Sequence, residues 1–168
     1  MRKIILISDT HSYLEPKLIK YMQAADEVWH AGDIGDIQVC EEIQQHSKLK
    51  AVFGNIDDNN IRQTYSENLE FMCEDVKVLI THIGGYPGKY PARVKGLIQN
   101  IKPQLFICGH SHILKVMYDN VHQLLHMNPG ACGTHGFHQV KTALRFEIDK
   151  TEIKKLEIIE LGKRNEII

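Results

Sequence analysis

Three short runs of largely apolar residues in the first third of the chain each end in a polar turn. The runs are Ile4–Ile7, Glu27–His30 and Lys50–Phe53. The first is continuously apolar and β-branched, which is typical of a strand buried on both faces. Apolar residues between Leu14 and Ala25 and around Ile37–Ile43 then recur with helical spacing. Strand, turn and helix in alternation predict a parallel βαβ arrangement.

The rest of the chain adds pairs of strands to this pattern. A helix is expected at Ala92–Ile101 and a buried strand at Leu105–Cys108. The predicted hairpins are Leu69–Cys73 with Val76–Ile80, Lys115–Asp119 with His122–Met127, and Thr142–Ile148 with Glu152–Glu160. With 168 residues, we expect a single domain that spans residues 1–168.

Composition excludes several classes of protein. The chain is 43% hydrophobic and 24% charged with a net charge of -1, whereas a dedicated nucleic-acid-binding protein usually has a basic excess. The four cysteines form no Cys-x-x-Cys pair, and isolated thiols suit a reducing cytosol. No signal peptide and no run of membrane-spanning length is evident. We therefore expect a cytoplasmic protein without membrane association.

Side chains that can bind metal follow five of the predicted strands. They are Asp9 and His11, Asp33, Asn55, His82, and the pair His110 and His112. In open α/β sheets, ligands bind beyond the carboxyl ends of the strands, so these residues are expected to converge. Gly109 precedes the last pair, and its permissive backbone would let both imidazoles turn toward one centre.

The size of this set predicts two metal ions. A single ion usually takes three or four protein ligands, whereas seven suit two divalent ions about 3.5–4 Å apart, bridged by a carboxylate and a water or hydroxide. Oxygen and nitrogen ligands without thiolate favour manganese, iron or zinc over magnesium or calcium. Manganese is our first choice, with zinc, iron or nickel as alternatives.

The ordered motifs Asp9-x-His11, Gly32-Asp33, Gly54-Asn55, His82 and Gly109-His110-x-His112 resemble those of the calcineurin-like metallophosphoesterases. The short length and the Asn128-Pro129-Gly130 turn are similar to the small YfcE-type phosphodiesterase branch. The resemblance extends to about Leu161. It implies a four-layer α/β/β/α sandwich, in which two mixed sheets are flanked by helices.

The resemblance also implies roles for the site residues. One metal would be held by Asp9, His11, Asp33 and His112, and the other by Asp33, Asn55, His82 and His110. Asp33 would bridge the ions, and a metal-bridging hydroxide would attack phosphorus, with Asp33, Asn55 and His82 as the catalytic set.

The expected activity is that of a hydrolase, a metal-dependent phosphodiesterase acting on a small phosphoester. A phosphomonoesterase or nucleotide pyrophosphatase using the same site is an alternative. A Vps29-like protein-binding scaffold is another alternative, and the family also suggests a homo-oligomer.

One position departs from the family pattern. Where most of the wider family has histidine after Gly54-Asn55, this chain has Ile56, which cannot protonate a leaving oxygen. The small branch often lacks this histidine too, so the metals are not put in doubt, but the identity of any general acid stays open. Asp57 could hydrogen bond to a metal ligand or serve as a turn carboxylate.

The remaining charged and imidazole side chains divide into two groups. Candidates for substrate contact are Arg62, Lys89, Arg93, His135 and His138. His30 is expected to be structural or to support a ligand, His46 to cap a helix, and His122 and His126 to pack on one face of a strand.

Overall fold

A computed structural model describes residues 1–166 and contains two five-stranded sheets. The first sheet has the order β10-β9-β1-β2-β3. Its strands are β1 (Arg2–Ile7), β2 (Glu27–His30), β3 (Lys48–Ala51), β9 (Val140–Asp149) and β10 (Glu152–Lys163). β1, β2 and β3 are parallel, whereas β9 is antiparallel to both β1 and β10. The N-terminal βαβ pattern was therefore predicted correctly.

The second sheet has the order β4-β5-β6-β8-β7. Its strands are β4 (Asn68–Cys73), β5 (Val76–Thr81), β6 (Leu105–Ile107), β7 (Leu114–Asp119) and β8 (Leu124–Pro129). β5, β6 and β8 are parallel, and the edge strands β4 and β7 are antiparallel to their neighbours. Both sheets are thus mixed.

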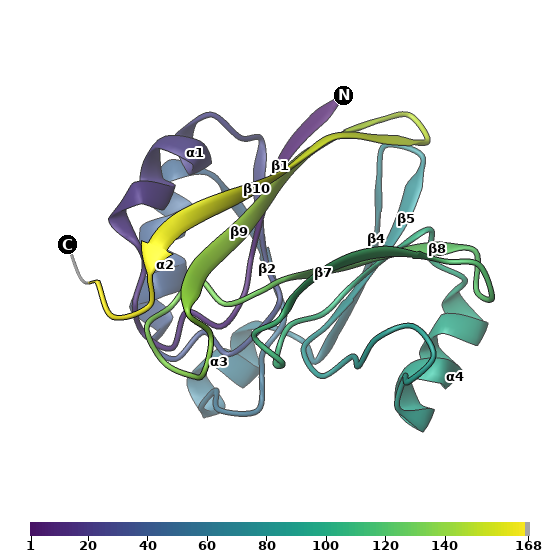
Figure 1. The fold of residues 1–168 in the computed structure, drawn as a ribbon, viewed down its shortest axis with the longest axis horizontal. Helices are drawn as coiled ribbons and strands as arrows, with labels where there is room; N and C mark the ends of the chain where they lie inside the picture. Colours follow the sequence, from purple (N-terminus) through teal and green to yellow (C-terminus); the bar gives the residue numbers. More distant parts are fainter. Residues whose placement is uncertain (167–168) are drawn as a thin grey trace.

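Helices cover the outer faces of the two sheets. They are the 3-10 helix η1 (Pro16–Leu18) and the α-helices α1 (Ile19–Gln23), α2 (Ile37–His46), α3 (Asn59–Thr64) and α4 (Ala92–Ile101). Figure 1 shows α1 and α2 on one side of the molecule and α4 on the other, with the sheets between them. The expected α/β/β/α arrangement is confirmed. Within residues 1–166, no helix is long and apolar enough to cross a membrane.

Strand β1 is apolar over its last four residues, Ile4–Ile7, because both of its faces are covered there. Ile4 and Leu6 belong to the cluster between the sheets, together with residues of β5 and β6. Ile5 and Ile7 point the other way, into the cluster beneath the helices of the first sheet. Successive side chains of a strand alternate between its faces, so the central strand supplies two separate cores.

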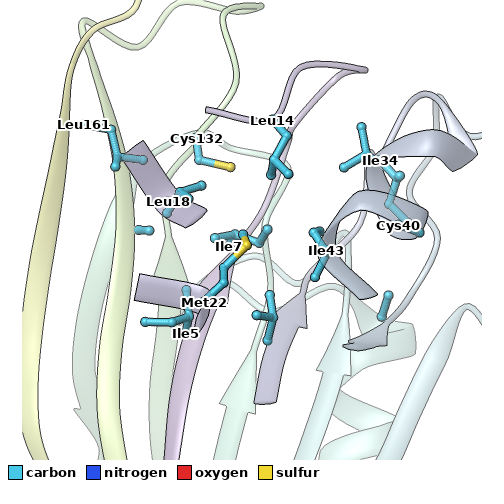
Figure 2. Close-up of a cluster of buried hydrophobic side chains, with 14 of the residues drawn as sticks. Ile5, Ile7, Leu14, Leu18, Met22, Ile34, Cys40, Ile43, Cys132 and Leu161 are labelled. Atoms are coloured by element: carbon cyan, nitrogen blue, oxygen red, sulfur yellow. The ribbon is translucent and has the colours of Figure 1, made fainter. Parts of the chain in front are cut away.

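The cluster beneath the helices places the loops that follow β1 and β2. Figure 2 shows Leu18, Met22 and Ile43 converging on Ile5 and Ile7 of β1. On the far side of the molecule, α4 packs against β5 and β6 through a third cluster. The strand ends that carry polar residues are therefore held by well-packed strands.

Several boundaries differ from prediction for local reasons. Pro16 opens a 3-10 turn, so the α-helix expected from Leu14 begins only at Ile19. Helix α3 was not predicted, and Asp58 caps it by accepting the backbone N–H of Ile61 at 3.1 Å.

The strand expected at His122–Met127 also begins late. The Asp119 carboxylate accepts the backbone N–H groups of Val121 and His122, which forms a turn, so β8 begins at Leu124. The prediction that His122 and His126 share a strand face was wrong.

A buried ion pair ties the start of β9 to the segment after β1. The side chains of Lys141 and Glu15 are fully buried and contact each other directly, and Lys141 also donates to the carbonyl oxygen of Glu166 at 2.6 Å. Removal of one partner leaves an uncompensated charge in the interior. Such a change typically destabilises by about 3–5 kcal/mol.

We therefore expect Lys141→Met to lower the free energy of unfolding by about 3 kcal/mol or more. Adding Glu15→Gln should restore a large part of the loss. Urea denaturation of the single and double variants measures both values. Lys48→Met is the control, because its 3.7 Å pair with Glu27 is exposed on the lysine side and should change stability by less than about 1 kcal/mol. Equal losses for Lys141→Met and Lys48→Met would contradict the prediction.

Candidate metal centre

The loops after strands β1, β2, β5 and β6 bring two groups of metal-binding side chains together. Asp9, His11 and His112 form one group, and Asp33, His82 and His110 form the other. Within each group, one potential ligand atom from every residue lies within 4.8 Å of the others. Six of the seven residues predicted to bind metal thus gather at one edge of the fold.

The Asp33 carboxylate lies between the two groups. Its Oδ2 atom is 3.2 Å from His82 Nε2 and 3.5 Å from His11 Nε2, and these two histidines belong to different groups. Asp9 Oδ1 lies 3.2 Å from His112 Nε2 and 3.9 Å from His82 Nε2. Asp33 Oδ2 and Asp9 Oδ1 thus each lie near histidines of both groups.

Several buried atoms in these groups have no hydrogen-bond partner within residues 1–166. They are Asp9 Oδ1, His11 Nε2 and His82 Nε2. Buried polar atoms are nearly always satisfied, and each exception calls for an explanation. A carboxylate oxygen and imidazole nitrogens that converge without partners fit the donor set of a divalent transition metal.

Each carboxylate is fixed through one oxygen, which leaves the other free. Asp9 Oδ2 accepts the Ser8 hydroxyl at 2.6 Å and the His110 backbone N–H at 3.2 Å. Asp33 Oδ1 accepts the Ile56 backbone N–H at 3.1 Å. The free oxygens are the ones that face the histidines.

The tautomer of His82 follows from its contact with the protein. Its Nδ1 atom lies 2.7 Å from the carbonyl oxygen of Ala31, which can only accept a hydrogen bond. Nδ1 therefore carries the proton when the ring is neutral, and the lone pair of Nε2 points toward Asp33. A backbone carbonyl that orients an imidazole in this way is common behind metal-ligating histidines.

Charge in the centre favours an ionised Asp33. Burial is the largest influence and raises the pKa of Asp33, but contact with His82, the Ile56 N–H and His11 outweighs it, so the pKa is lowered. Burial also lowers the pKa of His82, and the contact and charges of Asp33 and Asp9 reverse this, so its pKa is raised.

Five of the gathered residues have left-handed backbone conformations. They are Asp9 (φ 56°), His11 (φ 45°), Asp33 (φ 54°), His110 (φ 68°) and His112 (φ 58°). Positive φ is uncommon outside glycine and marks strain that concentrates at functional sites. The strained backbone turns successive side chains toward the same point.

The prediction that Gly109 supplies an unusual backbone conformation was wrong. Gly109 is not among the residues with positive φ; His110 and His112 adopt that conformation themselves. A Cβ atom at position 109 would lie 2.0 Å from Ser8 Oγ. Glycine is needed here because the two loops approach closely.

A cavity of about 270 Å³ opens over the two groups. Its lining includes Asn55, Ile56 and His135. Ile56 is 45% exposed, so it faces the cavity instead of packing beneath its loop. The ring of His135 lies 4.7 Å from that of His11.

The other candidates for substrate contact have different surroundings. His138 Nε2 lies 2.8 Å from the carbonyl oxygen of Gly133, and its ring is 5.2 Å from that of His112. Arg62 and Arg93 line a neighbouring cavity with Asn55 and His82. Lys89 instead extends over the ring of Tyr86 and lines neither cavity.

Buried supports join the loops of the centre. Asp57 accepts backbone N–H groups from Ile34, Gly35 and Gly54, at 3.1, 2.8 and 2.7 Å, so it ties together the loops that carry Asp33 and Asn55. It is thus more than a local turn carboxylate, although its bonds are to backbone and not to a ligand side chain.

His30 has a structural position, as expected. Its Nδ1 accepts the Gly32 N–H at 3.1 Å, so Nε2 carries the proton and donates to Thr10 Oγ1 at 2.9 Å. Burial lowers its pKa well below the ordinary value, so the ring stays neutral while it links the first two loops.

Sequence reasoning missed the supporting roles of Ser8 and Asn128. Asn128 donates to the carbonyl oxygen of Gly109 at 2.9 Å and to Ser111 Oγ at 3.1 Å, and it accepts the Gly130 N–H. The Asn-Pro-Gly turn was a usable signal for Asn128. No comparable pattern singled out Ser8.

Known proteins resemble this chain in sequence and in fold. A probable metallophosphoesterase from Methanocaldococcus jannaschii is 28% identical over 92% of this chain and 81% of its own length. A Streptococcus pneumoniae protein, described as a predicted phosphoesterase, has a TM-score of 0.72 with 21% identity over 95% of this chain and 90% of its own. A single mutant of Vps29 from Entamoeba histolytica has a TM-score of 0.74 with 15% identity, over 94% and 98% of the two chains. The structural likenesses show the fold alone.

Residues 1–151 match the family described as the calcineurin-like phosphoesterase superfamily domain. That span includes every residue of the two groups, which are Asp9, His11, Asp33, His82, His110 and His112. The chain belongs to the calcineurin-like phosphoesterase superfamily.

Proposed function

We propose that this protein is a dinuclear metal-dependent phosphodiesterase. The observation that carries the proposal is the pair of three-residue groups with Asp33 between them. Asp9, His11, Asp33 and His112 would hold one ion, and Asp33, Asn55, His82 and His110 the other. Manganese is the metal that we favour.

The residues of the centre have different roles in phosphoester hydrolysis. With both ions bound, the available chemistry is activation of a water between them as the nucleophile and neutralisation of charge on the phosphoryl oxygens. Asp33 is held by the Ile56 N–H, which keeps its second oxygen aimed between the groups. Asn55 contributes its exposed side chain from the cavity wall.

A protein-binding scaffold is the second candidate function. Its support is the similarity in fold to Vps29. The six converging side chains favour an enzyme, because a scaffold needs no buried ligand atoms without hydrogen-bond partners. A metal-loaded protein that is inactive on every mono- and diester would favour the scaffold.

Three further expectations belong to the same proposal. A cytoplasmic location agrees with the four free, buried cysteines. A single domain over residues 1–168 agrees with the continuous core between the sheets. A homo-oligomer is suggested by the family resemblance.

The first prediction concerns metal content. Elemental analysis after saturation with Mn²⁺ should find two ions per chain, and Asp33→Asn should lower that number and abolish most diester hydrolysis, since the bridging charge is weakened. Far-ultraviolet circular dichroism should be unchanged. One ion or fewer in the wild type would rule out the dinuclear centre.

The second prediction concerns His110, which lies at the exposed rim of its group. Replacement by alanine removes one ligand, so metal affinity and turnover should fall together. His46→Ala is a matched control, because His46 lies at the end of α2 outside both groups. Full activity of His110→Ala with only one bound ion would contradict a shared centre.

The third prediction follows from Ile56. A departing alkoxide needs a proton, and a positioned acid typically contributes about 10²–10⁴-fold. Ile56 supplies none, so aryl diesters should react much faster than alkyl diesters, with rates that fall steeply as leaving-group pKa rises. Ile56→His should help poor leaving groups more than good ones.

A series of aryl and alkyl diesters tests this dependence in the wild type and in the Ile56→His variant. Ile56→Leu is the control for packing at the cavity rim. A flat dependence in the wild type would show that another residue, such as His135 or His138, already supplies the proton.

A further inference from the structure

A second cavity of about 270 Å³ lies beside the proposed metal centre. Its lining includes Asn55 and His82 from the centre and two arginines, Arg62 and Arg93. Asn55 also lines the cavity over the two groups. The two cavities therefore share a wall at Asn55.

The Arg62 guanidinium is fixed in this wall by backbone carbonyls. Its Nε donates to Asp57 O at 2.7 Å, and its Nη2 donates to Gly54 O at 3.3 Å and Asn55 O at 3.2 Å. The guanidinium carbon lies 4.6 Å from the centre of the Phe53 ring. Among the described residues, no acceptor pairs with the two N–H groups of Nη1.

Arg93 is held from the start of α4 in a similar way. Its Nη1 donates to Asn68 Oδ1 at 2.8 Å, and its Nη2 donates to Thr81 Oγ1 and to Ile83 O, both at 3.1 Å. Its Nε–H has no acceptor in residues 1–166. Each arginine thus keeps free donors although its position is fixed.

Neither guanidinium has a carboxylate within ion-pair distance in the part of the chain that the structure describes. Glu67 lines the same cavity but pairs with neither arginine. The cavity thus has two fixed positive charges and one negative charge. A planar guanidinium with free N–H groups matches the geometry of phosphate oxygens.

The absence of an acid at position 56 points to the same kind of ligand. An alkoxide leaves well only when it is protonated. A phosphoryl group leaves readily without a proton, and its growing charge can be stabilised by nearby cations. A site with two arginines and no acid at position 56 is therefore suited to a leaving group that is itself a phosphate.

We propose that the cavity between Arg62 and Arg93 binds a second phosphoryl group of the substrate, so that the preferred substrates are small phosphoanhydrides. In the reaction, the oxygen of water bonds to the scissile phosphorus, and the bond from that phosphorus to the bridging oxygen breaks. The bridging oxygen keeps the electron pair on the departing phosphate, one proton of water goes to solvent, and the other stays on the new P–O–H group until it ionises. This proposal rests on the proposed function for the hydrolytic step.

The test compares a dinucleoside diphosphate with a single-phosphorus aryl diester. Arg93→Met removes the guanidinium and should lower kcat/KM for the diphosphate about 10- to 100-fold more than for the aryl diester, as expected for a charge-assisted hydrogen bond. Glu67→Gln removes the negative charge of the cavity, and it should raise kcat/KM for the diphosphate relative to kcat/KM for the aryl diester. Both arginines also hold groups beside a proposed ligand, Arg62 next to Asn55 and Arg93 next to His82, so the Glu67→Gln variant provides the independent test.

Lys95→Met is the matched control, because it removes a positive charge two residues along α4 and lies outside the cavity. Arg93→Lys keeps the positive charge but loses the planar guanidinium with its paired N–H donors. It should therefore recover only part of the preference for the diphosphate over the aryl diester. If Arg93→Met does not fold, Arg93→Lys and Glu67→Gln still test the proposal. A purely structural Arg93 could not account for an opposite shift in Glu67→Gln.

Binding measured without turnover separates this proposal from the proposed function. Calorimetry compares the binding of inorganic pyrophosphate and of orthophosphate to each Mn²⁺-loaded variant. Chelation of Mn²⁺ by a given probe is the same for every variant, so it does not affect the comparison between variants. A pyrophosphate preference lost in Arg93→Met and increased in Glu67→Gln supports the subsite, even if no phosphoester is hydrolysed. Diester hydrolysis with unchanged preferences in both variants would overturn the subsite and leave the proposed function standing.

Discussion

Fixation of one oxygen on each of Asp9 and Asp33 is the constraint on which the centre depends. Ser8 and the His110 backbone hold one oxygen of Asp9, and the Ile56 backbone holds one oxygen of Asp33. The Ile56 bond joins loops that follow two strands of the first sheet, whereas the His110 bond joins loops that follow strands of different sheets, so the orientation of Asp9 depends on the packing of the two sheets. The core between the sheets therefore determines the geometry of the centre.

The sequence predicted the arrangement of the fold better than the details of the loops. The apolar run of β1 and the helical period of α4 were clear because burial on a strand or helix face imposes a regular pattern. Helix α3 was missed because it is six residues long and depends on a cap at Asp58. The late start of β8 depends on a turn made by Asp119, which no periodicity reveals.

The candidate site was predictable in its residue types but not in its supports. One or two side chains at each of five strand ends were enough to locate the seven candidate ligands, because parallel strands deliver their ends to one edge. The contacts of Asp57 and Asn128 were not predictable in this way, since they bind backbone groups from segments distant in sequence. The role of Gly109 was misjudged because close approach between loops leaves no mark in a single sequence.

The left-handed backbone at five of the gathered residues has a consequence for how such a protein changes over evolutionary time. Each strained position costs of order 1–3 kcal/mol, and the same position would be relaxed with glycine. Once selection for catalysis is removed, replacement of the three histidines among them by glycine would relieve this backbone strain. Loss of activity would then be thermodynamically downhill while the two sheets remain intact, so a fold of this kind can readily outlast its original chemistry.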